Sequence, residues 1–345
     1  MKASGPAGAP GRGGTDDGRP RLVVASVQGR KSLPADRVTD LERVSRATFL
    51  SRDHTLTAEE ATALFADAEV LAITPKVSPV IDEDFLEALP NLRGICLHAT
   101  GYDFVDPAAL RRRGITLSTL LEYSTRSVAE QTLGLLLALS SRLHLANDRS
   151  RGLVHHGTSL RGFEIAGRTL GIIGCGRIGG TLARLAQALD MATIAYDIDP
   201  KPVPGVTYVT RDELFERSDV VTLHCPLPFD ASPLVGHDEI RSMLPGAVLL
   251  NSSRAALVDD EAVIAAIRDG HLRGYAVDDE LIGGPEVEDL LTEGRILQTG
   301  HSAWWTDEVL DRGSHMWADA IEAMLLGRPT AVVDPTVAPS DALAQ

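Results

Sequence analysis

One segment, residues 169–197, constrains the fold of this chain more than any other. It begins with an apolar β-type run that enters a Gly-x-Gly-x-x-Gly sequence at Gly174, Gly176 and Gly179 and continues into a helix-forming stretch. In such a segment the first glycine allows a tight turn, the second lets the backbone approach a pyrophosphate, and the third lets the helix pack on the strand. The pattern predicts a strand–turn–helix unit that binds a dinucleotide.

The ends of this unit indicate which dinucleotide binds. The predicted helix begins at Arg177 and Ile178, where free N–H groups and the positive end of the helix dipole would face the phosphates. The next predicted strand ends in Asp197, 18 residues after Gly179. A carboxylate at this place accepts hydrogen bonds from both ribose hydroxyls and repels a 2′-phosphate, so NAD is the predicted cofactor.

Strands and helices alternate along the rest of the chain. Apolar runs rich in β-forming residues predict strands at 21–27, 69–73, 93–97, 115–118, 169–173, 192–196, 219–224, 247–250, 273–277 and 295–298. Between them, helices are predicted at 57–66, 82–88, 106–112, 126–148, 177–189, 211–217, 237–243, 258–268 and 306–326. This alternation predicts parallel sheets with helical crossovers, and a chain of 345 residues has room for two such α/β domains.

Composition and charge argue against several classes of function. With 33 Lys and Arg against 48 Asp and Glu, the formal net charge of −15 argues against nucleic acid as a partner. No apolar run approaches the ~20 residues of a membrane span, and no secretory signal is visible. The three cysteines, Cys96, Cys175 and Cys225, lie apart and form no ligand cluster. We therefore expect a cytoplasmic protein without a metal, a membrane anchor or a nucleic-acid partner.

Several short blocks elsewhere in the chain carry a second signal. In order they are Asn91–Cys96, Thr100–Asp103, Ser127–Thr132, His224–Pro226, Asn251–Arg254 and Gln298–Ala303. In type and order they resemble the D-2-hydroxyacid dehydrogenase family, which includes phosphoglycerate, glycerate and D-lactate dehydrogenases. The resemblance implies a flavodoxin-like substrate domain into which a Rossmann NAD-binding domain is inserted. We accordingly expect a disordered tail at 1–20, a substrate domain at 21–125 plus 305–335, an NAD-binding domain at 126–304 and a C-terminal tail at 336–345.

The resemblance assigns most of the candidate site. Beyond the fingerprint, it implies cofactor contacts at Thr132, His224, Cys225, Pro226, Ser252, Ser253, Arg254, Asp278, His301 and Ala303. Asp278 would meet the carboxamide side of the nicotinamide, with a helix-capping role as its alternative. Substrate contacts are implied at Lys76, Val77, Thr100, Gly101, Arg254 and His301.

Arg254 and His301 carry the predicted chemistry. Arg254 follows the strand predicted at 247–250 and so lies at a carboxyl end, where open α/β sheets bind ligands. Its guanidinium can hold a carboxylate through paired charged hydrogen bonds and polarise the adjacent carbonyl. By resemblance His301 is the acid/base, a role that suits an imidazole near neutral pH. Taken without the resemblance, a surface arginine and a structural loop histidine are the alternatives.

Three departures from the family pattern lie near His301. The family usually has a Glu five residues after the counterpart of Asp278, bonded to the catalytic His, but position 283 is Gly here. Glu280, Glu286 or no residue would replace it. Gly300 stands where Pro is usual, and Trp304–Trp305 follow, similar to a run in the C-terminal-binding-protein corepressors. The two indoles would either line the pocket or serve packing and dimer contacts.

These residues predict an NAD-dependent oxidoreductase that interconverts a small D-2-hydroxy acid and its 2-oxo acid. Two alternatives stay open. One is a non-catalytic NAD(H)-sensing dimeric module, which the missing Glu and the paired tryptophans favour. The other is a dehydrogenase for a phosphonate or phosphorylated hydroxy acid, with Lys76 near the phosphate.

The helix predicted at 126–148 is apolar on most of its faces, which predicts burial between domains or subunits. Because family members commonly dimerise through this region, we expect a homodimer.

Overall fold

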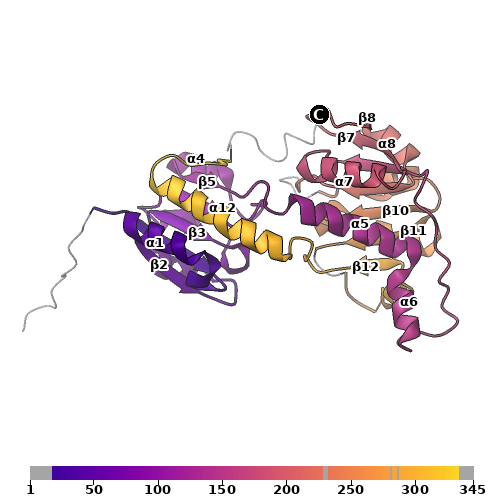
Figure 1. The fold of residues 1–345 in the computed structure, drawn as a ribbon, viewed down its shortest axis with the longest axis horizontal. Helices are drawn as coiled ribbons and strands as arrows, with labels where there is room; N and C mark the ends of the chain where they lie inside the picture. Colours follow the sequence, from indigo (N-terminus) through magenta and orange to yellow (C-terminus); the bar gives the residue numbers. More distant parts are fainter. Residues whose placement is uncertain (1–17, 228–231, 280–281, 286, 334–345) are drawn as a thin grey trace, which may run out of the picture.

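The computed structural model describes residues 18–227, 232–279, 282–285 and 287–333. They form two parallel β-sheets in two lobes, each with helices on both of its faces (Figure 1). The predicted fold class, two parallel-sheet α/β domains, is confirmed. The predicted tails fall outside the described residues, the N-terminal one up to residue 17 and the C-terminal one entirely.

The first sheet has the order β2-β1-β3-β4-β5, which is the flavodoxin-like order. Its strands are β1 (Arg21–Ser26), β2 (Arg46–Ser51), β3 (Val70–Ile73), β4 (Gly94–Leu97) and β5 (Thr116–Ser118). Alternate residues of β1 pack into different cores, Leu22 and Val24 on one face and Val23 on the other. The faces are covered by α1 (Ala35–Val44) with α12 (Asp307–Leu325), and by α2 (Ala58–Phe65), α3 (Glu83–Glu87) and α4 (Pro107–Arg113).

The second sheet has the order β12-β11-β10-β9-β6-β7-β8, again with all strands parallel. Its strands are β6 (Thr169–Ile173), β7 (Ala192–Tyr196), β8 (Val206–Tyr208), β9 (Val220–Leu223), β10 (Ala247–Asn251), β11 (Leu272–Val277) and β12 (Ile296–Gln298). The order reverses between β6 and β9, as in a Rossmann fold. Ligands bind at such a switch point, beyond the carboxyl ends of the strands.

Helices on the two faces of this sheet pack into separate cores. The helices α5 (Thr125–Ser141) and α7 (Arg177–Gln187) cover one face. The other face is covered by α8 (Arg211–Arg217), α9 (His237–Ser242), α10 (Asp260–Arg268) and α11 (Glu288–Thr292). None of the helices in the described ranges combines the length and apolar character that a membrane span needs.

The last helix brings the chain back to the first sheet. Trp317 of α12 is fully buried, and its Nε1 donates a hydrogen bond of 3.0 Å to the Cys96 carbonyl in β4. In Figure 1, α12 accordingly lies beside α1 on the lobe opposite the second sheet. The exact limits of the two domains stay a prediction.

Two differences from the predicted elements have local causes. The helix predicted at 126–148 is two helices, α5 and α6 (Leu143–Ser150), because Arg142 adopts a left-handed φ of 58°. The Ser140 carbonyl accepts a hydrogen bond from the Phe163 N–H (2.9 Å), a partner outside the helix, where the ladder breaks. The elements α1, β2, β8 and α11 were not predicted. Of these, β2 and β8 are edge strands without a fully buried residue, so their apolar signal is weak.

Candidate active site

The three fingerprint glycines occupy distinct environments in the turn between β6 and α7. Gly174 has a φ of +87°, and a Cβ there would lie 2.6 Å from the His224 carbonyl oxygen. A Cβ at Gly179 would overlap the Gly174 carbonyl. At Gly176, by contrast, nothing in the described chain lies within 4 Å of an added Cβ. Two glycines are therefore needed for packing, and Gly176 borders open space that a pyrophosphate can enter.

The residues at the start of α7 and after β7 suit two parts of a dinucleotide, its pyrophosphate and its adenosine ribose. Helix α7 begins at Arg177 and Ile178, and its N-cap Gly176 has no side chain with which to cap the first N–H groups. These N–H groups and the helix dipole favour an anion. Asp197 directly follows β7, and its Oδ1 accepts a hydrogen bond from the Asp199 N–H (2.9 Å), which fixes the carboxylate in place.

The loop after β9 faces the fingerprint across the switch point. Its first residue, His224, contacts Gly174 through the backbone, and its Nε2 lies 3.0 Å from Thr222 Oγ1. Burial lowers the pKa of His224 to about 4 and raises that of the Cys225 thiol to about 12. Both side chains are therefore neutral at pH 7, so neither is a candidate acid/base or thiolate. Pro226, the next residue, is exposed.

Thr132 and the two serines after β10 form a hydrogen-bonded link between α5 and the sheet. The Thr132 hydroxyl lies 2.8 Å from the Val128 carbonyl and 2.7 Å from Ser252 Oγ. Since a hydroxyl has one proton, Thr132 donates to one of these two oxygens at a time. Ser253 Oγ donates to the Leu223 carbonyl (2.9 Å). The loop that leads to Arg254 is thus held from both sides.

Arg254 reaches from this loop to the other domain. Its Nε donates to Asp103 Oδ2 (2.7 Å), its Nη2 lies 2.6 Å from the same oxygen, and its Nη1 donates to the Ser253 carbonyl (2.9 Å). The guanidinium also rests on Gly101, where a Cβ would overlap Nη2. The structure therefore brings together two predicted substrate-site residues, Arg254 and Gly101, from the two domains.

His301 has a carboxylate partner, Asp279, that was not predicted from the sequence. Its Nδ1 lies 2.8 Å from Asp279 Oδ1. The two candidates considered from sequence, Glu280 and Glu286, lie outside the described residues. The same Asp279 accepts a hydrogen bond from the Ala255 N–H at its other oxygen, Oδ2 (2.7 Å). One carboxylate thus joins His301 to the residue that follows Arg254.

Asp279 is ionised in this setting. Burial by itself raises the pKa of its carboxyl group. The hydrogen bonds with His301 and Ala255, together with the positive charges of His301 and Arg254, outweigh burial and lower the pKa below its ordinary value.

Asp278 holds the backbone of the loop that carries His301. It is 4% exposed, and its carboxylate accepts hydrogen bonds from Thr299 Oγ1 (2.6 Å) and from the N–H groups of Ser302 and Ala303 (both 2.8 Å). These bonds secure a turn in which Gly300 and His301 have φ values of 60° and 59°. Proline cannot adopt a positive φ, which gives a reason for Gly300. The role of Asp278 beside the nicotinamide stays a prediction.

The other predicted substrate residues lie on loops after β3 and β4. Lys76 is exposed and Val77 is buried in the 3₁₀ turn Pro75–Val77, where the Val77 N–H already donates to the Thr74 carbonyl (3.1 Å). Thr100 Oγ1 donates to the Leu120 carbonyl (2.6 Å). Within the described ranges, no hydrogen bond or ion pair joins the Lys76 side chain to Arg254 or His301. The substrate roles of these residues stay predictions.

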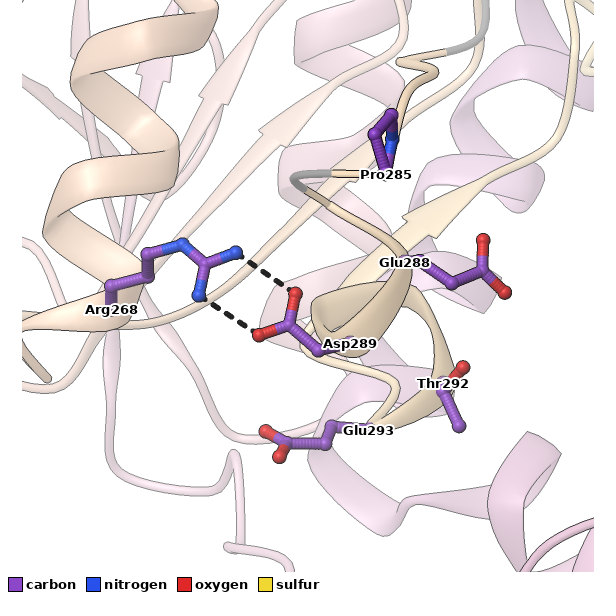
Figure 2. A pocket seen from close by; sticks show the side chains of 6 residues that line it. All are labelled: Arg268, Pro285, Glu288, Asp289, Thr292 and Glu293. Carbon is purple, nitrogen blue, oxygen red and sulfur yellow. Dashed lines mark hydrogen bonds and ion pairs between the residues drawn. The ribbon is translucent and has the colours of Figure 1, made fainter.

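Trp304 and Trp305 have different surroundings although their ring centroids lie 5.3 Å apart. Trp304 packs against the core under α12, whereas Trp305 is 67% exposed. The lining of the pocket in Figure 2 includes neither tryptophan and does not include His301. The pocket is lined by Arg268, Pro285, Glu288, Asp289, Thr292 and Glu293. Its one cation, Arg268, is bonded to Asp289. None of its lining residues belongs to the predicted site.

Residues that sequence reasoning missed are Asp103 and Asp279. Asp103 stands in a block used for the resemblance, and Asp279 is adjacent to a predicted residue. The position of either aspartate in the sequence does not reveal its contact, because Asp103 bonds a residue of the other domain and Asp279 bonds a residue of another loop. Among the described residues, no group of three or more His, Cys, Asp or Glu side chains could hold a metal ion.

Comparison with known proteins identifies the family. Residues 133–303 match the NAD-binding domain of the D-isomer specific 2-hydroxyacid dehydrogenases. The chain is 33% identical over 291 residues to glycerate dehydrogenase of Methylorubrum extorquens (82% of this chain, 90% of that protein). It is 32% identical over 267 residues to glyoxylate reductase of Korarchaeum cryptofilum (74% and 80%).

A solved structure agrees with this assignment. The apo-structure of D-lactate dehydrogenase from Escherichia coli is 26% identical, with a TM-score of 0.71 and coverage of 91% of this chain and 100% of that chain. The fold of this chain is thus shared with a solved structure over 91% of its length. This chain belongs to the D-isomer specific 2-hydroxyacid dehydrogenase family, whose cofactor is NAD.

Proposed function

We propose that this chain interconverts a small D-2-hydroxy acid and its 2-oxo acid with NAD as the hydride carrier. The observation that carries the proposal is the arrangement of His301 and Arg254, because Asp279 bonds both His301 and the N–H of Ala255, the residue after Arg254. Gly101 of the other domain packs against Arg254, so the candidate site lies between the two domains. The names of the relatives, glycerate dehydrogenase and glyoxylate reductase, support a small acid as the substrate.

The residues at the switch point fit NAD. The open space beside Gly176 and the N-terminus of α7 would hold the pyrophosphate, and Asp197 would hold the adenosine ribose. When bound, the nicotinamide accepts or supplies the hydride. The chain's own residues have two further tasks, to hold the carboxylate of the acid and to move a proton.

Arg254 keeps two N–H groups for the substrate carboxylate. A guanidinium has five N–H donors. The Nε N–H donates to Asp103, whose carboxylate also forms an ion pair with Nη2, and one Nη1 N–H donates to the Ser253 carbonyl. At least one donor is left on each terminal nitrogen, and paired donors of this kind match the two oxygens of a carboxylate. The same positive charge stabilises the oxygen of the adjacent carbonyl as it becomes an alkoxide.

His301 keeps one ring nitrogen for proton transfer. Its Nδ1 is bonded to Asp279, and 52% of the side chain is exposed. With the Nδ1 proton donated to the carboxylate, Nε2 is the nitrogen that faces the substrate. It protonates the carbonyl oxygen during reduction and takes the proton from the hydroxyl during oxidation.

Reduction of 2-oxo acids with NADH tests this proposal. We expect the wild-type chain to consume NADH with at least one of glyoxylate, hydroxypyruvate, pyruvate and phosphonopyruvate. Arg254→Ala should lower turnover by roughly 10²-fold or more, the scale of losing a transition-state charge clamp. Arg268→Ala is the matched control, because Arg268 is paired with Asp289 outside the site (Figure 2). If none of the four acids consumes NADH, the proposed reaction is rejected in favour of an NAD(H)-sensing module.

The two alternatives stand on weaker observations. A sensing module was favoured by the missing Glu, but Asp279 offers His301 a carboxylate, so that argument no longer separates sensor from enzyme. A phosphonate or phosphorylated acid would need cations for its phosphate. Lys76 is exposed and available, and phosphonopyruvate in the panel tests this variant of the substrate.

We also propose a homodimer that uses the exposed apolar side chains of α5 and α6 and the turn after them. Leu137, Leu143 and Leu153 are all exposed, and they follow one another along this part of the NAD-binding domain. The location in the cytoplasm stays a prediction.

A further inference from the structure

We propose that Asp279 is the positioning carboxylate of His301, taking the part that a Glu five residues after Asp278 has in relatives of this chain. The inference rests on the proposed function of His301 as the acid/base. It assigns to Asp279 a second task as well, which is to fix the loop of Arg254 relative to the imidazole.

The hydrogen bonds of Asp279 use both of its oxygens. Oδ1 lies 2.8 Å from His301 Nδ1, and Oδ2 accepts the Ala255 N–H at 2.7 Å. The Asp279 side chain is 13% exposed, whereas that of His301 is 52% exposed. The carboxylate thus lies under the imidazole on the protein side, and the exposed side of the ring is left for the substrate.

The backbone around β11 explains how a residue at this position reaches His301. Asp278 and Asp279 are the first two residues after β11. Asp278 accepts hydrogen bonds from the Thr299 hydroxyl and from the N–H groups of Ser302 and Ala303, while Asp279 bonds the side chain of His301. Because His301 has a left-handed φ of 59°, its backbone is strained, and the two carboxylates hold the strained residue from two directions.

A carboxylate at this place has a chemical consequence. It accepts the Nδ1 proton and so leaves Nε2 as the nitrogen that exchanges a proton with the substrate. It also stabilises the imidazolium from which the proton is given during reduction. In an amide at this place the oxygen would accept the Ala255 N–H, so the NH2 group would donate to Nδ1; the ring proton then moves to Nε2 and the base needed for oxidation is lost.

The competing explanation is that Asp279 only ties two loops together. Asp219 is a matched control for this, because it makes the same kind of bonds at the amino ends of the strands, away from the candidate site. Its carboxylate accepts the Thr169 N–H (2.9 Å) and pairs with Arg168 (2.7 Å). Asp219→Asn should therefore change stability alone, whereas Asp279→Asn should also change the pH profile of the reaction.

The experiment compares wild type, Asp279→Asn, Asp279→Glu and Asp219→Asn in NADH-dependent reduction across pH. Among the described residues, Asp279 is bonded to the His301 ring, Arg254 acts on the pKa of Asp279, and Asp278 is bonded to the N–H of Ser302 next to His301. For Asp279→Asn we expect kcat to fall about 10²-fold, less than the ~10⁴-fold of a fully buried triad because His301 is half exposed. The pH at which reduction falls to half should move down by about one unit, the low end for a lost opposite charge.

The controls and a second readout keep the outcome decisive. Asp279→Glu, which keeps the carboxylate, should retain the wild-type midpoint, as should Asp219→Asn. NADH affinity, measured by fluorescence, should be the same in all four proteins. A fall in kcat with an unchanged midpoint would overturn the inference and leave Asp279 as a loop tie.

The protein without cofactor separates this inference from the proposed function. In imidazole NMR spectra, the His301 signal is assigned by its loss in His301→Gln. Its titration should have a lower midpoint in Asp279→Asn than in wild type, even if no oxo acid is reduced. An identical titration in both proteins would reject Asp279 as the partner of His301, whereas a shifted titration in an inactive protein would reject the reaction alone.

Discussion

The contact between Asp103 and Arg254 makes a sharp prediction about substrate binding. Asp103 Oδ2 binds both Nε and Nη2 of Arg254, and this pair joins the two domains. If Asp103 orients the guanidinium so that its two remaining donors face the substrate, Asp103→Asn will weaken binding of the oxo acid. If Asp103 instead competes with the substrate carboxylate for Arg254, the same change will strengthen binding.

The size of the effect follows from the exposure of the pair. The Arg254 and Asp103 side chains are 31% and 38% exposed, so the value of a buried charged hydrogen bond must be discounted for solvent. One charged hydrogen bond together with its ion pair near the surface contributes about 1.4 kcal/mol to the orientation of Arg254. That free energy corresponds to about a tenfold change in an equilibrium constant. We therefore expect the KM for the oxo acid to rise about tenfold.

Steady-state NADH oxidation measures this effect. The change should fall mainly on KM, because the carboxylate is held in both the ground state and the transition state. NADH affinity should stay within a few tenths of a kcal/mol of wild type, since Asp103 is in the other domain. Glu83→Gln is a suitable control, because Glu83 pairs with Arg112 and Arg113 on the surface of the same domain. A KM that is unchanged or lower in Asp103→Asn would refute the orienting role.

Two further predictions concern packing and acid stability. Gly101→Ala should lower turnover of the oxo acid at least tenfold, because the added Cβ overlaps Arg254 Nη2. NADH affinity should not change. Turnover within twofold of wild type would contradict this contact. Burial lowers the pKa of His98 to about 4, partly offset by a hydrogen bond with the Gly313 backbone. Between its unfolded pKa of about 6.5 and pH 4, the unfolded chain binds a proton that the folded chain does not, so stability falls as the pH falls. In urea unfolding, the free energy of unfolding should fall between pH 7 and pH 4.5 by about 2–3 kcal/mol less for His98→Gln than for wild type. An equal fall in both proteins would rule out His98 as the cause.

The sequence predicted the elements that carry strong periodic signals. The fingerprint glycines and the buried strands β6, β9 and β10 are apolar and bounded by turn residues, so their positions follow from local chemistry. The break at Arg142 could not be predicted, because it depends on a hydrogen bond from Phe163 to the Ser140 carbonyl. That contact joins segments 23 residues apart and leaves no mark in the helical pattern of either one.

Some residues of the candidate site could likewise be predicted from the sequence, and others could not. Arg254 and His301 stand in blocks whose residue types and spacing resemble the family, so they were predicted from sequence. Asp103 acts across the domain boundary, and its partner lies 151 residues further along the chain. Such a contact depends on how the two domains pack, which no local pattern specifies.

The case of Asp279 shows why a missing residue in a motif does not by itself remove a chemical group. What His301 requires is a carboxylate oxygen within hydrogen-bond distance of Nδ1, and the distance along the chain from Asp278 has no physical role. The two residues that directly follow β11 are both aspartates here. Asp278 is used for the backbone of the histidine loop, which leaves Asp279 for the imidazole. A carboxylate this close to the strand is carried by the sheet itself, so we expect it to be held more rigidly than one placed further out in the loop.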